Sequence, residues 1–240
     1  MAVPLSDVRS ALVITAHPDD VDFGASASIA AWTAAGIEVS YCIVTFGDAG
    51  GFDETPREQM AALREAEQRA AAKVVGVTDV TFLGHPDGRV YVTHELRRDI
   101  TRQIRRVRPQ RVLTQSPQRN WQRIAPSHPD HLAVGEAALC AVYPDARNPF
   151  AHPELLAEEG LGAWTVPEVW LMGGPQPDHY VDVTDTFDRK VEALRAHVSQ
   201  TAHLGDGLET MLRTWHAANA HNAGLPDGRL AEAYQIVSTA

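Results

Sequence analysis

Strand-like and helix-like segments alternate along most of this chain, and that alternation constrains the possible fold more than any other feature. Apolar runs that read as strands occupy residues 11–16, 37–45, 79–83, 111–115 and 167–172. Helical patterns fill the intervals, over residues 24–35, 55–74, 95–107 and 131–142, and a later one covers 187–198. Strict alternation predicts an α/β fold, in which helices cover both faces of a mostly parallel sheet.

The ends of these segments carry further signals. Thr55-Pro56-Arg57-Glu58 fits a capping box with proline at the first helical position. Beyond Gly205 the pattern weakens to one helix over residues 208–220, a turn at Pro226 and an end that the sequence leaves undecided. No internal repeat or linker interrupts the chain. We therefore expect a single Rossmann-like domain over residues 1–240.

The charge balance excludes some classes of partner. The 240 residues include 21 Lys plus Arg and 31 Asp plus Glu, a net charge of −10, which argues against a protein held on nucleic acid or an anionic membrane. No apolar run approaches the roughly 18 residues of a membrane span, and the first ten residues lack the apolar core of a signal peptide. Cys42 and Cys140 make neither a disulfide framework nor a zinc cluster. A cytoplasmic enzyme is the expectation.

In a parallel sheet, ligands bind beyond the carboxyl ends of the strands. The loops at these ends begin after Ala16, Thr45, Leu83, Gln115 and Met172. The first loop reads His17-Pro18-Asp19-Asp20. A dinucleotide-binding chain would carry glycines there so that its backbone could approach pyrophosphate, whereas an imidazole and two carboxylates repel phosphate or bind metal. The usual nucleotide function is therefore excluded.

The loop after the fourth strand leads to Ser127-His128-Pro129-Asp130-His131 at a predicted helix start. Residues three apart there lie on one side, so His128 and His131 can face the same pocket. If both loops meet, His17, Asp20 and His131 supply two nitrogens and one oxygen to a divalent ion. Three protein ligands plus a position for water are typical of catalytic zinc, which suits hydrolysis. Asp19 and His128 then remain as acid and base candidates.

Simpler interpretations stay open beside this one. His-Pro-Asp can be only a turn, and we interpret His85-Pro86-Asp87-Gly88 as a turn because it has flanking glycines and no second acidic residue. Ser127 with Asp130 resembles a capping box, so Asp130 could cap the helix, orient His128, or do both. The other histidines lack a partner at ligand spacing and are expected in the core or on the surface: His94, His152, His179, His203, His216 and His221.

The two His-Pro-Asp segments together resemble the PIG-L/LmbE-like zinc-dependent de-N-acetylase family. Supporting similarity is found in residues 45–51, in Leu63-Arg64-Glu65, and in residues 181–184 and 197–200, so that the likeness extends from about Leu12 to Gln200. Val21 departs from the family, because many members have an acidic residue at that position. It comes after the proposed ligands in the chain, so the departure removes none of them. The membrane segment of eukaryotic members is absent, so the resemblance implies a soluble bacterial type.

The resemblance implies the reaction and the residues that perform it. The positions that match the zinc ligands are His17, Asp20 and His131. Asp19 matches the general base and His128 the residue that stabilises the tetrahedral oxyanion, with Asp130 beside it. The implied activity is removal of the N-acetyl group from an amino-sugar conjugate, in which Asp19 takes a proton from zinc-bound water and later delivers it to the leaving nitrogen. Acetate and a free amine result.

For other positions the resemblance gives less specific predictions. Asp48 and Arg64 match substrate-contacting positions of the family. Asp48 as a turn residue and Arg64 as a solvated helix residue remain open alternatives. His197 is expected to pack beside the apolar stripe of Leu194 and Val198 rather than to act in catalysis.

Three rival functions use similar residues. A non-haem Fe(II) oxygenase also binds metal with two His and one carboxylate, but it often has an all-β scaffold and does not require Asp19. A metal phosphoesterase would need more ligands, typically for two ions. A non-catalytic metal-containing sugar-binding protein would need no general base. The sequence favours the hydrolase.

The identity of the N-acetylated substrate stays open. Residues 120–127 precede the second metal loop and are expected near the pocket. Trp121 could stack on a sugar face or anchor in the core. Arg119 and Arg123 could bind a phosphate or carboxylate, or lie in solvent. A homo-oligomer is compatible with the resemblance, although no segment identifies an interface.

Overall fold

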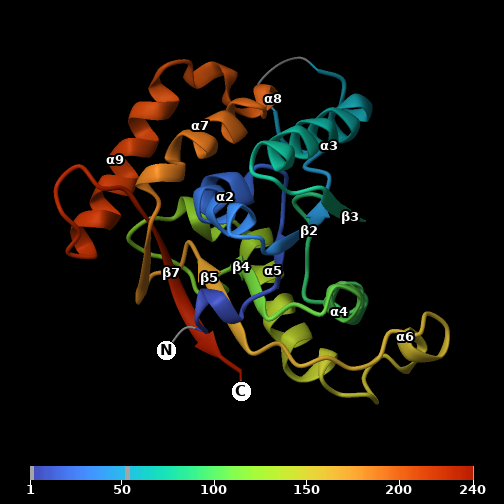
Figure 1. Cartoon of the computed structure of the whole chain (residues 1–240). Coiled ribbons are helices and arrows are strands. Elements are labelled where there is room, and N and C mark those ends of the chain that lie inside the picture. Colours follow the sequence, from blue (N-terminus) through green and yellow to red (C-terminus); the bar gives the residue numbers. More distant parts are fainter. Residues whose placement is uncertain (1–2, 52–54, 240) are drawn as a thin grey trace.

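The computed structural model describes residues 3–51 and 55–239. Within them, seven strands form one sheet in the order β3-β2-β1-β4-β5-β7-β6 (Figure 1). The strands are β1 Ser10–Thr15, β2 Glu38–Thr45, β3 Asp79–His85, β4 Arg111–Gln115, β5 Glu168–Met172, β6 His179–Asp182 and β7 Ala231–Ser238. Strands β1 to β5 pair in parallel, whereas β7 pairs antiparallel with both β5 and β6. The predicted mostly parallel sheet is confirmed, and its antiparallel strand β7 lies in the segment that the sequence left undecided.

Helices cover both faces of the sheet, as predicted. They are α1 Asp20–Gly24, α2 Ser26–Ala34, α3 Arg57–Val74, α4 His94–Val107, α5 Pro129–Cys140, α6 Pro153–Ala157, α7 Phe187–Arg195, α8 Val198–Thr201 and α9 Gly207–Asn222. The start expected for the helix over 24–35 is wrong, because helical structure begins with α1 at Asp20 and is interrupted at Ala25 before α2 begins. Pro56 is the N-cap of α3 rather than its first helical residue. Among the described residues, no helix combines the length and the apolar character that crossing a membrane requires.

Two apolar cores lie on opposite faces of the sheet. Successive side chains of a strand point to opposite faces, so Val13 enters one core while Leu12 and Ile14 enter the other. The first core also contains side chains of α2 and α3, and the second contains side chains of α4 and α5. Because both faces are covered, β1 is buried along almost its whole length.

The strand order places the two predicted metal loops beside each other. Strand β1 pairs with β2 on one side and with β4 on the other, so the order of strands reverses at β1. A crevice forms at such a reversal, outside the carboxyl ends of the strands. The loop after β1 contains residues 16–19, and the segment after β4 leads into α5. Both therefore open into the same crevice.

Gly135 allows α5 to pack directly against the end of β4. A Cβ atom at this position would collide with the carbonyl oxygen of Gln115 and would lie 3.0 Å from the backbone nitrogen of Pro117. These neighbours are backbone atoms and cannot rotate away. Since α5 carries His131, the Gly135 contact holds this histidine at the edge of the crevice.

We expect Gly135→Ala to lower the free energy of unfolding by about 1–3 kcal/mol, because the added methyl group overpacks the contact between α5 and β4. Urea unfolding followed by circular dichroism measures this change. Gly207→Ala is the matched control, since Gly207 also lies in a helix but has open space around its Cβ position. Equal stability of the two variants would show that the close packing of α5 is not needed.

Candidate active site

His17, Asp20 and His131 bring their ligand atoms together in the crevice. The Nδ1 atom of His17 lies 3.3 Å from Nε2 of His131. The carboxylate of Asp20 reaches both rings, with Oδ2 lying 3.3 Å from His17 Nδ1 and Oδ1 lying 3.0 Å from His131 Nε2. The structure therefore brings the three predicted metal-ligand candidates into contact, although their loops are far apart in the sequence.

Hydrogen bonds on the far side of each ring select the nitrogen that faces this point. The Nδ1 atom of His131 lies 3.1 Å from the carbonyl oxygen of Pro126, to which it donates. The Nε2 atom of His17 lies 3.0 Å from Asp87 Oδ1 and 3.2 Å from Asp130 Oδ2. A metal-binding histidine commonly donates its second ring N–H to a carbonyl or a carboxylate. Nδ1 of His17 and Nε2 of His131 are the ring nitrogens that face Asp20 and that a metal ion would contact.

The spacing of the three donors fits a small divalent ion. Bond lengths of 2.0–2.1 Å around tetrahedral zinc place neighbouring ligand atoms about 3.3 Å apart. The contacts of His17, Asp20 and His131 span 3.0–3.3 Å. Gln115 also donates to Asp20 Oδ2 over 2.9 Å and accepts from the backbone N–H of Ala16 over 3.0 Å, which fixes the carboxylate relative to β1. The donor set thus fits a metal ion in chemistry and in spacing.

Besides the set of His17, Asp20 and His131, two further groups among the described residues could hold a metal, and both include His17. One comprises His17, His128 and His131, and the other His17, Asp87 and Asp130. The carboxylates of the second group are already occupied, because Asp87 Oδ2 accepts from the N–H of Ala49 over 2.8 Å and Asp130 Oδ2 accepts from the N–H of Gly88 over 2.8 Å. They fit a role as acceptors for His17 Nε2–H better than a role as ligands.

Asp87 is a site residue that the sequence interpretation missed. The predicted turn does form at Asp87 and Gly88, but the carboxylate of Asp87 also contacts His17, a role that the turn interpretation did not include. His85 is different, since its ring contacts Asp99 at 3.2 Å. The sequence signal that could have revealed this role of Asp87 is its position, because the segment follows β3 at the same edge of the sheet as the other loops.

Asp130 also has different partners from those expected. The N-cap of α5 is His128, whose Nδ1 accepts from the backbone N–H of Asp130 over 3.2 Å, so the predicted Ser127–Asp130 capping box does not form. The side chain of Asp130 is 1% exposed and binds His17 and the backbone of the 88–90 loop. Its backbone therefore orients His128, and its carboxylate orients His17.

His128 faces the crevice as a neutral donor. Burial and the neighbouring His17 and His131 lower the pKa of His128 below its usual value. Because Nδ1 accepts from the N-terminus of α5, the neutral ring carries its proton on Nε2. Its ring centroid lies 5.0 Å from that of His17. An N–H donor therefore lies beside the candidate metal ligands.

Negative charge surrounds His17. Burial lowers the pKa of His17, but Asp20, Asp130 and Asp87 outweigh that effect and raise it to about 12. Burial raises the pKa of Asp20, and the two histidines His131 and His17 reverse this to well below its usual value. Three carboxylates around one imidazole form an environment that a divalent cation would neutralise.

Asp19 points away from Asp20, toward α3. Its backbone has the left-handed conformation, with φ of 80°, which is strained for a residue other than glycine. Its Oδ2 lies 3.2 Å from Arg64 Nη2, and its N–H donates to Gln68 Oε1 over 2.8 Å. Burial raises the pKa of Asp19 to about 6, against the opposing effect of Arg64. The two adjacent carboxylates thus face different partners, Arg64 for Asp19 and the two histidines for Asp20.

Arg64 is 4% exposed, so the alternative of a solvated helix residue is wrong. It donates to the carbonyl oxygens of Gly47 and Pro18, each over 2.8 Å, and thereby joins the loops after β1 and β2. Gly47 has a φ of 68° and lies against the guanidinium so closely that a Cβ atom would collide with it. Asp48 is exposed beside this contact, and its substrate role stays a prediction.

His197 has a polar role that the packing interpretation missed. Its Nε2 lies 2.8 Å from Asp22 Oδ2, and both side chains are fully buried. Burial lowers the pKa of His197, but the hydrogen bond to Asp22 outweighs it and raises the pKa. Gln68 also donates to Asp22, over 2.9 Å. This buried group supports Gln68, which in turn holds the backbone of Asp19.

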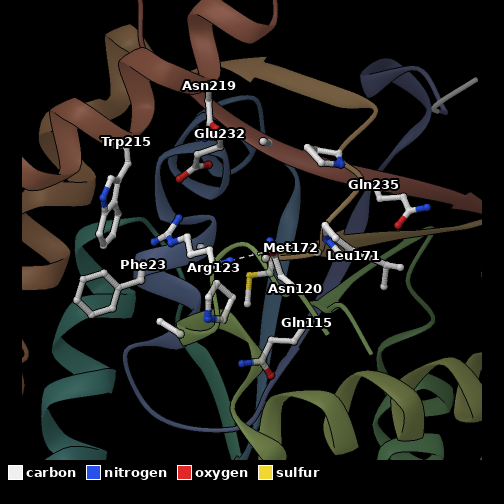
Figure 2. Close-up of a pocket in the computed structure, with 18 of the residues that line it drawn as sticks. Phe23, Gln115, Asn120, Arg123, Leu171, Met172, Trp215, Asn219, Glu232 and Gln235 are labelled. Carbon is white, nitrogen blue, oxygen red and sulfur yellow. Dashed lines mark hydrogen bonds between the residues drawn. The ribbon is translucent and has the colours of Figure 1, made fainter. Parts of the chain in front are cut away.

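A cavity of about 630 Å³ begins at the metal-ligand candidates, with Asp20, Gln115 and His131 in its wall. Asn120, Gln122, Arg123, Ala125 and Pro126 line it too, so most of the expected 120–127 segment does reach the pocket. Trp121 is 82% exposed and is not one of the described residues that line the cavity. Arg123 lies 4.3 Å from the centroid of the Trp215 ring (Figure 2).

Comparison with known proteins identifies the family of the chain. The family described as GlcNAc-PI de-N-acetylase (PIG-L) matches residues 12–142, more than half of the chain. The chain belongs to the PIG-L family. This matched region contains every predicted site residue, from His17 in the loop after β1 to His131 in α5.

Individual relatives extend the similarity beyond that region. The diacetylchitobiose deacetylase of Thermococcus kodakarensis is 32% identical over 198 residues, which cover 82% of this chain and 72% of that protein. The probable N-acetyl-alpha-D-glucosaminyl L-malate deacetylase 2 of Bacillus cereus is 30% identical over 221 residues, covering 87% and 88%. The structure of N,N'-diacetylchitobiose deacetylase from Pyrococcus horikoshii superimposes with a TM-score of 0.89 at 28% identity, covering 98% of this chain and 86% of that one.

The contact between Asp87 and His17 predicts an effect on metal affinity. Asp87→Asn removes a carboxylate from His17 Nε2, and we expect divalent metal to bind about 10–100-fold more weakly. Competition with a chromogenic chelator measures the affinity. Asp99→Asn is the control, because it removes the same kind of carboxylate from His85, outside the donor set. Unchanged affinity in Asp87→Asn would contradict a supporting role for Asp87.

Proposed function

We propose that this protein is a zinc-dependent hydrolase that removes the N-acetyl group from an amino-sugar conjugate, a derivative of N-acetylglucosamine. The observation that carries the proposal is the convergence of His17 Nδ1, His131 Nε2 and the Asp20 carboxylate within 3.0–3.3 Å, beside Asp19 and the Nε2–H of His128. Relatives named as deacetylases of diacetylchitobiose and of an N-acetylglucosaminyl malate support this class of substrate.

His17, Asp20 and His131 would hold the ion. Two imidazoles and one carboxylate are a known ligand set of hydrolytic zinc. When bound there, the ion would polarise the acetyl carbonyl and lower the pKa of a water molecule. The chain's own residues must then orient the amide, move the protons and receive the negative charge.

Asp19 is the proposed general base. Its Oδ2 is engaged by Arg64, which leaves Oδ1 to accept a proton from the attacking water. The oxygen of that water forms the new bond to the carbonyl carbon. The protonated Asp19 then delivers its proton to the amide nitrogen as the C–N bond breaks, so that acetate and a free amine leave.

His128 is the proposed oxyanion donor. Its Nδ1 accepts from the start of α5, and its Nε2–H can donate to the carbonyl oxygen as negative charge develops there. A preorganised donor of this kind typically stabilises the transition state by about 3 kcal/mol. Asp130 supports both the proposed oxyanion donor and a proposed ligand, because its backbone N–H donates to His128 and its side chain contacts His17.

Arg64 has a positioning role in this proposal. It binds Asp19 and the carbonyl oxygens of residues 18 and 47, so its guanidinium fixes the proposed base relative to two loops. Asp48 is exposed and directly follows Gly47, whose carbonyl oxygen binds Arg64, and it is the proposed contact for a sugar hydroxyl. The PIG-L family match includes both positions.

Amine release from N-acetylated sugars tests the function. We expect the purified protein loaded with zinc to release acetate and amine in equal amounts from N-acetylglucosamine conjugates, and a chelator to stop both. Activity that depends on iron and oxygen would instead indicate an oxygenase. Saccharide binding without turnover, with zinc, iron or manganese supplied in turn, would indicate a binding protein.

Substitution of the proposed base separates catalysis from metal binding. Asp19→Asn keeps the size of the side chain but cannot accept the proton, so we expect turnover to fall by about 10²–10⁴-fold with zinc content unchanged. Steady-state kinetics and metal analysis of the same sample measure the two effects. His131→Ala is the matched comparison and should lose zinc first. Retained turnover per bound zinc in Asp19→Asn would remove Asp19 from the mechanism.

A further inference from the structure

Gln68 on α3 makes two hydrogen bonds to the segment that follows β1. Its Oε1 accepts from the backbone N–H of Asp19 over 2.8 Å, and its Nε2 donates to Asp22 Oδ2 over 2.9 Å. Gln68 is fully buried and is not one of the described residues that line the cavity. Any influence of Gln68 on the proposed reaction must therefore pass through the residues that it binds.

The conformation of Asp19 is fixed by its two flanking peptide groups. The peptide group before it is held at both ends, since its N–H donates to Gln68 and the carbonyl oxygen of Pro18 accepts from Arg64 over 2.8 Å. The peptide group after it is held by two backbone N–H groups of α1, which both donate to the carbonyl oxygen of Asp19 over 2.9 Å. These contacts keep φ at 80°, a value that residues other than glycine rarely adopt. Two fixed peptide planes also fix the direction of Cβ, and thus of the carboxylate.

Asp22 sets the orientation of the Gln68 carboxamide. Its Oδ2 binds Gln68 and lies 2.8 Å from Nε2 of His197, and the side chains of Asp22 and His197 are fully buried. A carboxylate can only accept hydrogen bonds, so the N–H groups of Gln68 must face Asp22 and its oxygen must face Asp19. With the carboxamide reversed, two donors would meet at the Asp19 N–H and two acceptors would meet at Asp22.

A parallel contact fixes the part of α3 that carries Gln68. Glu67, the preceding residue, accepts from the backbone N–H and from the hydroxyl of Ser199, each over 2.7 Å. His197 and Ser199 belong to one short segment at the start of α8, so this segment fixes two successive side chains of α3. Residues 197–199 lie outside the 12–142 region matched by the PIG-L family. The backbone of the proposed base is thus tied to the C-terminal part of the chain.

We propose that Gln68 is a positioning residue, whose carboxamide holds Asp19 in the left-handed conformation that directs the proposed base into the site. Asp22 and His197 supply the fixed acceptor that orients this carboxamide. Without it, Asp19 is free to leave the strained conformation, and its carboxylate then accepts the proton of the attacking water less often. The proposal rests on the proposed function, because Gln68 acts through the proposed base.

Removal of both hydrogen bonds tests the proposal. Gln68→Met keeps the length of the side chain but has no N–H group and no carbonyl oxygen. We expect kcat for N,N'-diacetylchitobiose to fall about 10–100-fold, with KM and zinc content unchanged. Gln59→Met is the matched control, because Gln59 is exposed on the same helix, and it should leave all three quantities unchanged. Thermal unfolding of both variants checks that the fold is intact.

Gln115→Met should affect the metal instead of the base. Gln115 holds the other carboxylate in the same manner, since it accepts from the N–H of Ala16 over 3.0 Å and donates to Asp20 Oδ2 over 2.9 Å. Because Asp20 is a metal-ligand candidate, we expect this variant to bind zinc about 10–100-fold more weakly. Competition with a chromogenic chelator measures the affinity. Equally weakened zinc binding in Gln68→Met would overturn the positioning role.

Exchange of donor and acceptor tests the orientation of the carboxamide. Gln68→Glu still accepts from the Asp19 N–H but presents a second acceptor to Asp22, so kcat should fall at least as far as in Gln68→Met. Adding Asp22→Asn restores a donor opposite that acceptor, and we expect kcat to recover about fivefold. No recovery in a double variant that folds and binds zinc would overturn the proposal.

Hydrogen exchange of the Asp19 amide examines the contact without turnover. By NMR, this amide should exchange about 3–10-fold faster in Gln68→Met than in the wild-type protein or Gln59→Met. Equal exchange would show that Gln68 does not hold the backbone of Asp19. Absence of amine release from the wild-type protein would refute the hydrolase, whereas equal kcat in the wild-type protein and Gln68→Met would refute the positioning role alone.

Discussion

The position of His17 depends on contacts to both of its ring nitrogens, and the rest of the site is arranged around them. Nε2 is held by Asp87 and Asp130, and Nδ1 faces Asp20 and His131. These four partners come from three places in the chain: the start of α1, the loop after β3 and the start of α5. The ring therefore links the carboxyl ends of β1, β3 and β4, and a shift of any one loop would move the donor atoms of the others.

This arrangement concentrates negative charge in a buried place, which is costly unless the charge is compensated. Backbone N–H groups compensate Asp87 and Asp130, and Arg64 compensates Asp19. Asp20 accepts from one carboxamide and from the backbone N–H of His17, and it contacts two imidazoles. The imidazoles of His17 and His131 supply its positive charge and hold its pKa well below the usual value. A divalent cation bound at this point would take over that compensation and leave both rings neutral.

Much of this could be predicted from the sequence, because the signals are local. Strand periodicity located β1 to β5, and the rule for strand ends selected the loops that carry His17, Asp20 and His131. Asp87 could not be separated from an ordinary turn, since His-Pro-Asp-Gly is also a good turn sequence and its partner His17 lies on another strand. Strand β7 was missed for a related reason. Its buried Glu232 breaks the apolar alternation, and the ammonium that compensates it comes from Lys190 in α7.

The two halves of the cavity are held in physically different ways, and this bears on how such a chain can change its substrate. Around the metal-ligand candidates each side chain has two or more fixed partners, so a substitution there disturbs its neighbours as well. In the opposite wall, Trp215 and Asn219 project from one helix, and their neighbours on that face can change without moving a strand end. Glu232 is the exception, because Lys190, Ser28 and Tyr234 all depend on it. The side chains of α9 that face the cavity can therefore change while the groups around His17 keep their positions.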